Sequence, residues 1–185
     1  MTKQELRNTY KKIREEVPNK NIKSEKIASS LLSSNICQKA NTVCIYVNML
    51  NEVNTTNIIE YLLKNNKIVG VPVIKNDIVE FYKINSLDEL TNTANFGIKE
   101  PLPSPALLIN KKDIDLIIVP GVCFDLENNR LGFGKGYYDK YLIDLPTKAM
   151  KIGICFEKQI IKNALLPIEE HDIKMDYLFT ENQVY

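Results

Sequence analysis

Residues 130–139 form a glycine-rich segment, Arg-Leu-Gly-Phe-Gly-Lys-Gly-Tyr-Tyr-Asp, whose residue types and spacing suit anion binding. Glycine lets a ligand approach the backbone closely, so that exposed N–H groups can point at a phosphate. Arg130 can hold a phosphate with two parallel hydrogen bonds, and Lys135 adds a compact positive charge. The segment holds three of the seven glycines of the chain: Gly132, Gly134 and Gly136. We therefore expect a phosphate-binding loop here.

The loop alone leaves its ligand open. No Ser or Thr follows Lys135, so the segment is not a Walker motif, and G-x-G-x-G is not the dinucleotide fingerprint. A tight turn that enters a helix explains the glycines without any ligand. With a ligand, the phosphate can belong to a nucleotide, a sugar phosphate or coenzyme A. The chain can accordingly be an enzyme or a module that binds without turnover.

Two acidic residues are candidates for a metal site. Asp139 lies in the first turn of the helix expected after the loop. The helix dipole favours an acid there, so Asp139 either stabilises the helix or binds magnesium beside phosphate groups. Asp172 follows His171, the only histidine, and one histidine cannot build a zinc site without other ligands. A carboxylate can instead bind magnesium, and Asp172 is a candidate to join Asp139 at such an ion.

Three further charged residues are candidates for ligand contacts. Lys3 and Arg7 are four residues apart and share one face of the expected N-terminal helix. The helix dipole disfavours cations near this end, and an anionic ligand would relieve that conflict, although a solvated basic face is the simpler alternative. Glu52 follows an expected strand, so it is either a ligand contact or a surface acid. All three residues stand beside element ends, where sites commonly form.

The hydrophobic pattern predicts one α/β domain over residues 1–185, with a largely parallel sheet flanked by helices in a Rossmann-like three-layer sandwich. Thr2 and Glu5 form a capping box that begins the first helix. Helices are expected at residues 2–17, 22–32, 54–64 and 136–143. Strands are expected at residues 42–48, 67–73, 78–84, 115–120, 151–156 and 177–180. Pro72 must lie near a strand end or edge, residues 91–113 form a long surface connection, and ligands should bind beyond the carboxyl ends of the strands.

Composition limits the classes of partner. The formal net charge is +1 and no apolar run approaches the ~20 residues that span a membrane, so neither nucleic acid nor membrane is an expected partner. The N-terminus is polar and lacks the core of a signal peptide, which favours the cytoplasm. The cysteines lack the spacing of a zinc knuckle or redox pair, so all should be reduced: Cys37, Cys44, Cys123 and Cys155.

Taken together, these residues resemble the pattern of the 5-formyltetrahydrofolate cyclo-ligase family, also called methenyltetrahydrofolate synthetases. The resemblance extends from the first helix to the last expected strand, and residues 130–139 are its most specific part. The other matching segments are Lys3-x-x-Leu-Arg7, Glu52 in Asn-Glu-Val-Asn-Thr, residues 115–121, Phe124-Asp125, Gln159 and Pro167 with His171-Asp172. Lys140 stands where an arginine is common, and residues 74–112 match loosely.

The resemblance implies an enzyme that uses ATP and Mg²⁺ to convert 5-formyltetrahydrofolate to 5,10-methenyltetrahydrofolate, with ADP and phosphate released. We expect the protein to be a monomer. Phosphorylation of the formyl oxygen would allow N10 to close the ring. The implied ATP-binding residues are Lys3, Arg7, Arg130, Gly132, Phe133, Gly134, Lys135, Gly136, Tyr137 and Tyr138. The implied folate-binding residues are Val47, Met49, Glu52, Tyr137 and Tyr138. The implied catalytic residues are Arg130, Lys135 and Tyr138, and the implied magnesium ligands are Asp139 and Asp172.

Overall fold

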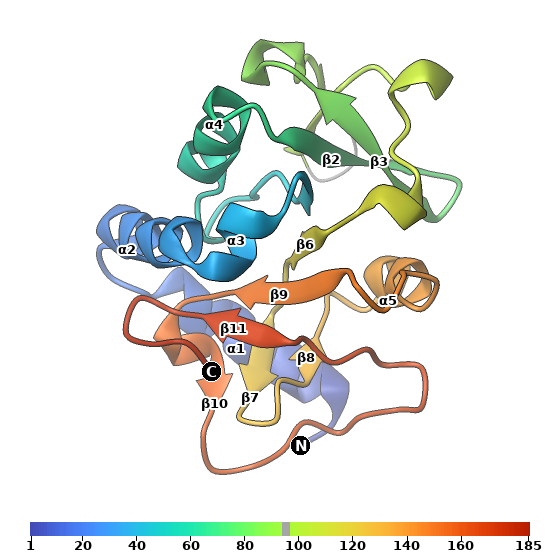
Figure 1. Cartoon of the computed structure of the whole chain (residues 1–185). Coiled ribbons are helices and arrows are strands. Elements are labelled where there is room, and N and C mark those ends of the chain that lie inside the picture. The colour runs from blue at the N-terminus through green and yellow to red at the C-terminus, as the bar shows by residue number, and fades with distance from the viewer. Residues whose placement is uncertain (94–96) are drawn as a thin grey trace.

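The apolar runs of the sequence form a six-stranded sheet in the computed structural model, which describes residues 1–93 and 97–185. The strand order is β11-β9-β6-β1-β2-β3 (Figure 1). The strands are β1 (Thr42–Ile45), β2 (Ile68–Lys75), β3 (Ile78–Ile84), β6 (Leu116–Val119), β9 (Met150–Ile154) and β11 (Tyr177–Phe179). Neighbouring strands are parallel except for the β2–β3 hairpin. The expected α/β fold with a largely parallel sheet is therefore confirmed.

Helices cover both faces of this sheet. The helices are α1 (Lys3–Glu15), α2 (Lys20–Ser33), α3 (Asn35–Lys39), α4 (Thr56–Lys64) and α5 (Tyr137–Leu142). Val43 and Ile45 of β1 point into the core under α2 and α4, whereas Cys44 between them points into the opposite core, which includes Tyr141 of α5. Alternate residues of one strand thus face two cores, and this explains why the central strands are continuous apolar runs. All four cysteines are free and buried, as expected for structural thiols.

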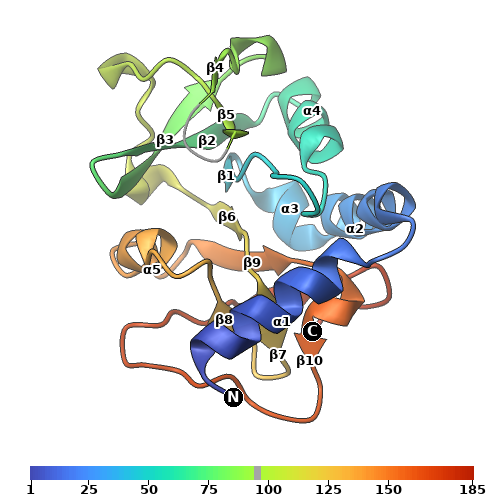
Figure 2. The ribbon, with the colours of Figure 1, turned by 180° about the vertical axis from the view of Figure 1, so that it is seen from behind.

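Helix α1 has a different role from the other helices, because it packs on a second, three-stranded sheet (Figure 2). This sheet has the order β10-β7-β8 and consists of β7 (Cys123–Asp125), β8 (Arg130–Leu131) and β10 (Ile160–Ile161). Leu6 and Tyr10 of α1 contact Cys123 and Leu131. The capping box of Thr2 and Glu5 is present as predicted. One face of α1 thereby packs on the small sheet, and the face that carries Lys3 and Arg7 lines the cavity described below.

The hairpin and its proline follow the sequence expectation. Asn76 and Asp77 form the β2–β3 turn with φ values of 51° and 60°, the left-handed conformation that a tight hairpin requires. Pairing of β2 with β1 ends at Gly70, so Pro72 lies where β2 extends beyond β1 and no ladder bond from that neighbour is lost. Strand β1 ends at Ile45 instead of the expected residue 48, which leaves the next residues free to line a cavity.

Residues 91–113 were expected to be a long surface connection, and the structure shows short elements within them. Residues 94–96 of this segment lie outside the described residues. The segment carries β4 (Asn92–Thr93), β5 (Lys99–Glu100) and two 3₁₀ turns, Pro105–Leu107 and Lys111–Asp113. Glu100 and Ile109 are buried. Further 3₁₀ turns lie at Leu87–Glu89 and Glu157–Gln159. Within residues 1–93 and 97–185, no helix has both the length and the apolar character for a membrane span.

Candidate active site

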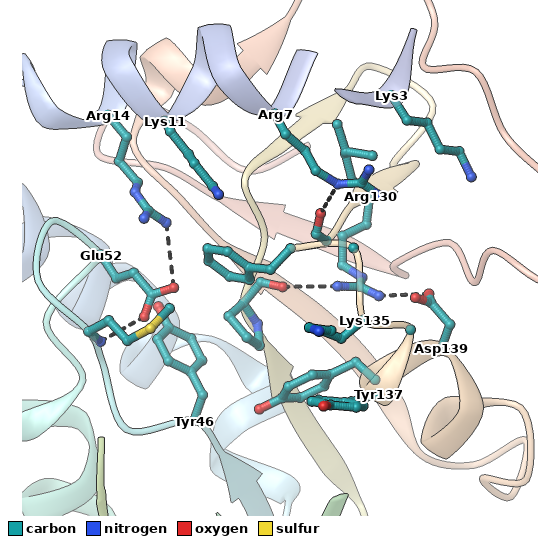
Figure 3. A pocket seen from close by; sticks show the side chains of 18 of the residues that line it. Lys3, Arg7, Lys11, Arg14, Tyr46, Glu52, Arg130, Lys135, Tyr137 and Asp139 are labelled. Carbon is teal, nitrogen blue, oxygen red and sulfur yellow. Dashed lines mark hydrogen bonds and ion pairs between the residues drawn. The ribbon is translucent and has the colours of Figure 1, made fainter. Parts of the chain in front are cut away.

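A cavity of about 1040 Å³ lies beyond the carboxyl ends of β1, β2 and β6. Residues that follow β1, the end of β2 and the residue after β6 contribute to its wall, and α1 and the glycine-rich loop close it (Figure 3). All the site residues expected from the sequence line it: Lys3, Arg7, Val47, Met49, Glu52, Arg130, Gly132, Phe133, Gly134, Lys135, Gly136, Tyr137, Tyr138, Asp139 and Asp172. The fold therefore brings together segments that are more than a hundred residues apart in the chain.

We call one side of this cavity the loop end, formed by Lys3, Arg7, residues 132–136, Asp139 and Asp172. Gly134 and Gly136 have φ values of 100° and 68°, which side chains other than glycine rarely adopt. A Cβ atom on Gly134 would also lie 3.2 Å from Cζ of Arg7. The Arg7 Nε–H donates a 2.9 Å hydrogen bond to the Gly132 carbonyl oxygen. The two glycines thus shape the loop, and Arg7 holds it against α1.

Each acid at the loop end is paired with a cation. Lys3 Nζ lies 2.6 Å from Asp172 Oδ2 and 2.9 Å from Glu169 Oε1. Partial burial opposes the charge of Lys3, but these bonds outweigh it and raise the pKa of Lys3, while the same contact lowers the pKa of Asp172. Arg130 Nη2 lies 2.6 Å from Asp139 Oδ1. The candidate metal ligands and candidate phosphate ligands therefore neutralise one another.

Arg130 differs from the other cations because it is enclosed. Its side chain is only 3% exposed, and Nη1 donates a 3.1 Å hydrogen bond to the Pro120 carbonyl oxygen. Its Nε–H is buried without a hydrogen-bond partner among the described residues. The guanidinium therefore connects the end of β6 to Asp139 at the start of α5. This network fixes the orientation of the helix that follows the loop.

The donor set at the loop end suits magnesium better than zinc. Asp139 and Asp172 are hard oxygen donors, and Mg²⁺ typically takes one or two carboxylates together with water and phosphate oxygens. Within the described ranges 1–93 and 97–185, no group of three or more His, Cys, Asp and Glu residues could hold a metal ion. A protein-only metal cage is therefore not formed there, whereas two carboxylates beside a bound phosphate would satisfy magnesium.

We call the opposite side of the cavity the inner end, formed by Arg14, Tyr46, Met49 and Glu52. Glu52 Oε2 accepts a 2.8 Å hydrogen bond from the Met49 N–H, and Glu52 Oε1 lies 3.5 Å from Arg14 Nη1 (Figure 3). The side chains of Arg14 and Glu52 are 8% and 5% exposed. Burial raises the pKa of Glu52, and the Met49 N–H and the Arg14 charge only partly offset this effect. The inner end thus holds an enclosed ion pair in which burial disfavours the charged form of Glu52.

Aromatic side chains connect the two ends. The Phe133 ring lies below Arg14, with the guanidinium carbon 5.4 Å from the ring centroid. Tyr137 donates a 2.6 Å hydrogen bond to Asp77 in the β2–β3 turn. Burial strongly raises the pKa of Tyr138, so this hydroxyl stays protonated and can only donate or accept a hydrogen bond as a neutral group. These rings provide flat surfaces suited to a planar heterocycle.

Several residues that line the cavity were missed by the sequence reasoning. Lys11 and Arg14 continue the face of α1 that carries Lys3 and Arg7, so helical spacing alone would have found them. Glu100 and Ile98 come from the loosely matching middle region. The Ile74 N–H donates a hydrogen bond to Glu100. No local pattern marks these middle residues, because the chain returns to the sheet over a long connection.

Comparison with known proteins gives consistent results. The model of the 5-formyltetrahydrofolate cyclo-ligase family matches residues 1–181. A probable 5-formyltetrahydrofolate cyclo-ligase of Schizosaccharomyces pombe is 36% identical over 159 residues, which are 80% of this chain and 78% of the relative. The solved 5,10-methenyltetrahydrofolate synthetase of Aquifex aeolicus matches with a TM-score of 0.85 and 35% identity over 100% of this chain and 92% of that one. The Mycoplasma pneumoniae synthetase structure matches with a TM-score of 0.76 and 26% identity, covering 98% and 99%.

Proposed function

The chain belongs to the 5-formyltetrahydrofolate cyclo-ligase family, and from this premise we propose that it converts 5-formyltetrahydrofolate and ATP to 5,10-methenyltetrahydrofolate, ADP and phosphate. One observation carries the proposal: a single cavity has a glycine-lined loop end with several cations and a buried inner end that holds Glu52 beside Arg14. Its volume of about 1040 Å³ reaches the upper range of small-molecule sites, as a site for two substrates requires.

The ATP phosphates are assigned to the loop end. Lys3, Arg7 and Lys135 supply positive charge there, and the N–H groups of residues 132–136 supply neutral donors. Lys135 is exposed in the loop and has no ion pair with a described residue, so its charge is available. Arg130 acts from the enclosed position beneath the loop. Its contribution is the orientation of Asp139 and of α5, together with positive charge below the phosphates.

Magnesium fits the same end through Asp139 and Asp172. When bound there, Mg²⁺ would neutralise charge on the phosphate oxygens and align them for transfer. Lys3 and Arg130, the present partners of these carboxylates, would orient them for the ion.

The folate is assigned to the inner end, where Val47, Met49 and Glu52 line the wall. A pterin ring presents neighbouring N–H donors, and an ionised carboxylate accepts two of them in parallel. Tyr138, at the start of α5, interacts with both Glu52 and Arg130, and Tyr137 beside it also lines the cavity. This arrangement directs the formyl group of the substrate toward the phosphate loop.

The chemistry follows from this placement. The formyl oxygen attacks the γ-phosphorus, the bond from that phosphorus to the β-γ bridging oxygen breaks, and ADP leaves with the electron pair. The folate N10 then attacks the formyl carbon, the carbon–oxygen bond breaks, and phosphate leaves with the formyl oxygen and the N10 proton. Both steps depend on positioning and charge neutralisation, so no nucleophilic side chain is needed. Closure of the cavity around the phosphorylated intermediate would limit its loss to water.

The proposal includes a monomer that works in the cytoplasm. Its direct test mixes the purified protein with 5-formyltetrahydrofolate and follows the absorbance of 5,10-methenyltetrahydrofolate with and without ATP and magnesium. Product that appears only with both is the expected result. Tight folate binding with no product would instead favour a module that binds without turnover. Calorimetry that finds no ATP binding would favour an enzyme acting on another phosphate compound.

A further inference from the structure

Helix α1 presents a row of four cations to the cavity, two more than the resemblance assigns to ATP. Lys3, Arg7, Lys11 and Arg14 all line the wall and point into the cavity from one side of the helix (Figure 3). Arg14 follows Lys3 by eleven positions, which corresponds to about 16 Å along a helix. The row is therefore long enough to extend from the loop end to the inner end.

Three of these four cations already have partners. Lys3 is paired with Asp172, and Arg14 is paired with Glu52. Arg7 donates to the Gly132 carbonyl oxygen. Lys11, in contrast, forms no hydrogen bond or ion pair with any residue in ranges 1–93 and 97–185. It is half-buried, so its side chain already lies against the protein instead of extending into solvent.

The contact that Lys11 does make places it beside the glycine-rich loop. Its Nζ lies 6.0 Å from the centroid of the Phe133 ring, and Phe133 belongs to the glycine-rich loop. Arg14 lies over the same ring. A cation–π contact does not neutralise an ammonium group, so Lys11 keeps its charge and can donate to an anion from the side away from the ring.

We propose that Lys11 is a catalytic residue that binds the γ-phosphoryl group while it passes from ATP to the formyl oxygen. The inference rests on the proposed function, which places the phosphates on one side of Lys11 and the folate on the other. In this transfer the formyl oxygen bonds to phosphorus while ADP departs with the electrons of the broken bond, and negative charge spreads over the three remaining phosphoryl oxygens. A cation without a competing acid is suited to these oxygens in the transition state.

Kinetics can distinguish a lysine that contacts the moving phosphoryl group from a cation that only attracts substrate. A residue that contacts mainly the moving group affects kcat, whereas a residue that binds ATP or folate in the ground state affects KM. Lys12 provides the matched control because it is the next residue of α1, is exposed, and does not line the cavity. Both positions accept a straight-chain amide without loss of helix propensity.

The test compares Lys11→Gln, Lys11→Arg and Lys12→Gln with the wild-type protein. We expect Lys11→Gln to lower kcat by about 100-fold, the effect typical of losing one charge-stabilising donor, with both KM values changed less than about threefold. Lys11→Arg should recover part of the rate because the charge returns. Lys12→Gln should match wild type. Circular dichroism checks that α1 is intact in each variant.

A binding measurement adds a readout independent of turnover. The measurement adds 5-formyltetrahydrofolate and magnesium-ADP with fluoroaluminate, which mimics the moving phosphoryl group. Lys11→Gln should bind this mimic more weakly than the wild-type protein does. Its affinity for ADP alone should stay at the wild-type value. Equal kcat values for Lys11→Gln and Lys12→Gln, or equal loss of affinity for ADP and for the mimic, would overturn the role of Lys11. A wild-type protein that forms no product would instead reject the proposed function, and Lys11's role with it.

Discussion

The two ends of the cavity hold their charges in different ways. At the loop end the Lys3 and Asp172 side chains are 20% and 18% exposed, and Glu169, which shares Lys3, is 56% exposed. At the inner end the Arg14 and Glu52 side chains are 8% and 5% exposed. Water or a ligand can therefore replace the partners of Lys3, whereas the inner pair is enclosed by protein. The Lys3 pairs are therefore suited to an exchange of partners, and the inner pair to a fixed one; the Arg130–Asp139 pair of the loop end, 3% and 16% exposed, resembles the inner pair.

This difference predicts different energetic consequences. Exposed ion pairs contribute roughly 0–1 kcal/mol, because solvent screens them and side-chain entropy opposes them. Removing one partner of a buried pair costs about 3–5 kcal/mol, because the other charge is left in a dry site. Substitutions of Lys3 and Lys135 at the loop end should therefore impair chemistry and spare the fold. Substitutions at the inner end should affect both.

The largest expected effect comes from Lys135→Ala at the loop end. Loss of this exposed charge should lower turnover by about 10²–10³-fold, because the developing phosphate charge loses a donor. The free energy of unfolding should stay within about 0.5 kcal/mol of wild type, since surface changes rarely matter for stability. Steady-state kinetics and urea titration measure the two quantities. Lys140→Ala, an exposed lysine on α5 outside the cavity, is the control, and unchanged turnover in Lys135→Ala would remove that residue from the phosphate site.

The next effect tests the buried pair through pH. The pKa of Glu52 is raised on folding, so its contribution to stability is complete below the ordinary carboxyl pKa of about 4.3 and is lost as pH rises through the raised value. Arg14→Met removes a charge that holds this pKa down. Relative to wild type, the variant should lose about 3 kcal/mol of unfolding free energy near pH 8 and progressively less toward pH 5.

Arg14 is the charged group that affects the pKa of Glu52 in this pH range. Arg14 of α1 is the cation facing it, and the Tyr46 and Tyr138 hydroxyls are the other titrating groups that interact with it. Burial raises the pKa of both tyrosines, so they stay neutral across this range. Arg14→Lys, which keeps the charge, serves as the control. If the wild-type and Arg14→Met stability curves run parallel with pH, Arg14 does not set the charge of Glu52.

Glu52→Gln tests whether the inner end recognises the folate. The amide keeps the shape of the side chain but loses one acceptor and the charge, so the folate KM should rise by about 10–100-fold, as expected for a lost charged hydrogen bond. The KM for ATP should change less than about threefold. Glu60→Gln, an exposed acid on α4, controls for general charge effects. An equal rise in both KM values would contradict the separation of the two ends.

The smallest expected effect is the stability change in Lys3→Met. Its pairs with Asp172 and Glu169 are partly exposed, so the unfolding free energy should fall by less than about 1 kcal/mol and the difference should shrink further in high salt. Urea titrations at low and high salt provide the measurement. A loss as large as that of Arg14→Met would show that exposure does not distinguish the two ends.

Much of the fold follows from local sequence rules. The Thr2–Glu5 capping box, the apolar run of β6 and the turn at Asn76 each specify their element without distant contacts. The small sheet of β7, β8 and β10 was not expected, because strands of two or three residues show no periodicity. The partners of Arg130, which join Pro120 and Asp139, likewise depend on how the chain folds back on itself.

Many residues of the candidate site could be predicted from the sequence, but their pairing and burial could not. Spacing and residue type identified Lys3, Arg7 and the loop, and the same helical spacing extends to Lys11 and Arg14. The pairing of Lys3 with Asp172 could not be foreseen, because 169 positions separate them. The burial of Glu52 depends in the same way on α1 and the residues after β1 meeting in space. The sequence thus indicates which charged side chains are present, and the fold determines which of them are buried, ion-paired or unpaired.

An oxygen label tests most directly whether phosphoryl transfer joins the two ends. The wild-type protein is given 5-formyltetrahydrofolate that carries ¹⁸O in the formyl group, together with unlabelled ATP and magnesium, and the inorganic phosphate is examined by mass spectrometry. Phosphorylation of the formyl oxygen predicts one ¹⁸O atom in each phosphate released with 5,10-methenyltetrahydrofolate. Product formed with unlabelled phosphate would contradict transfer to the formyl oxygen and, with it, the proposed roles of Lys135 and Lys11.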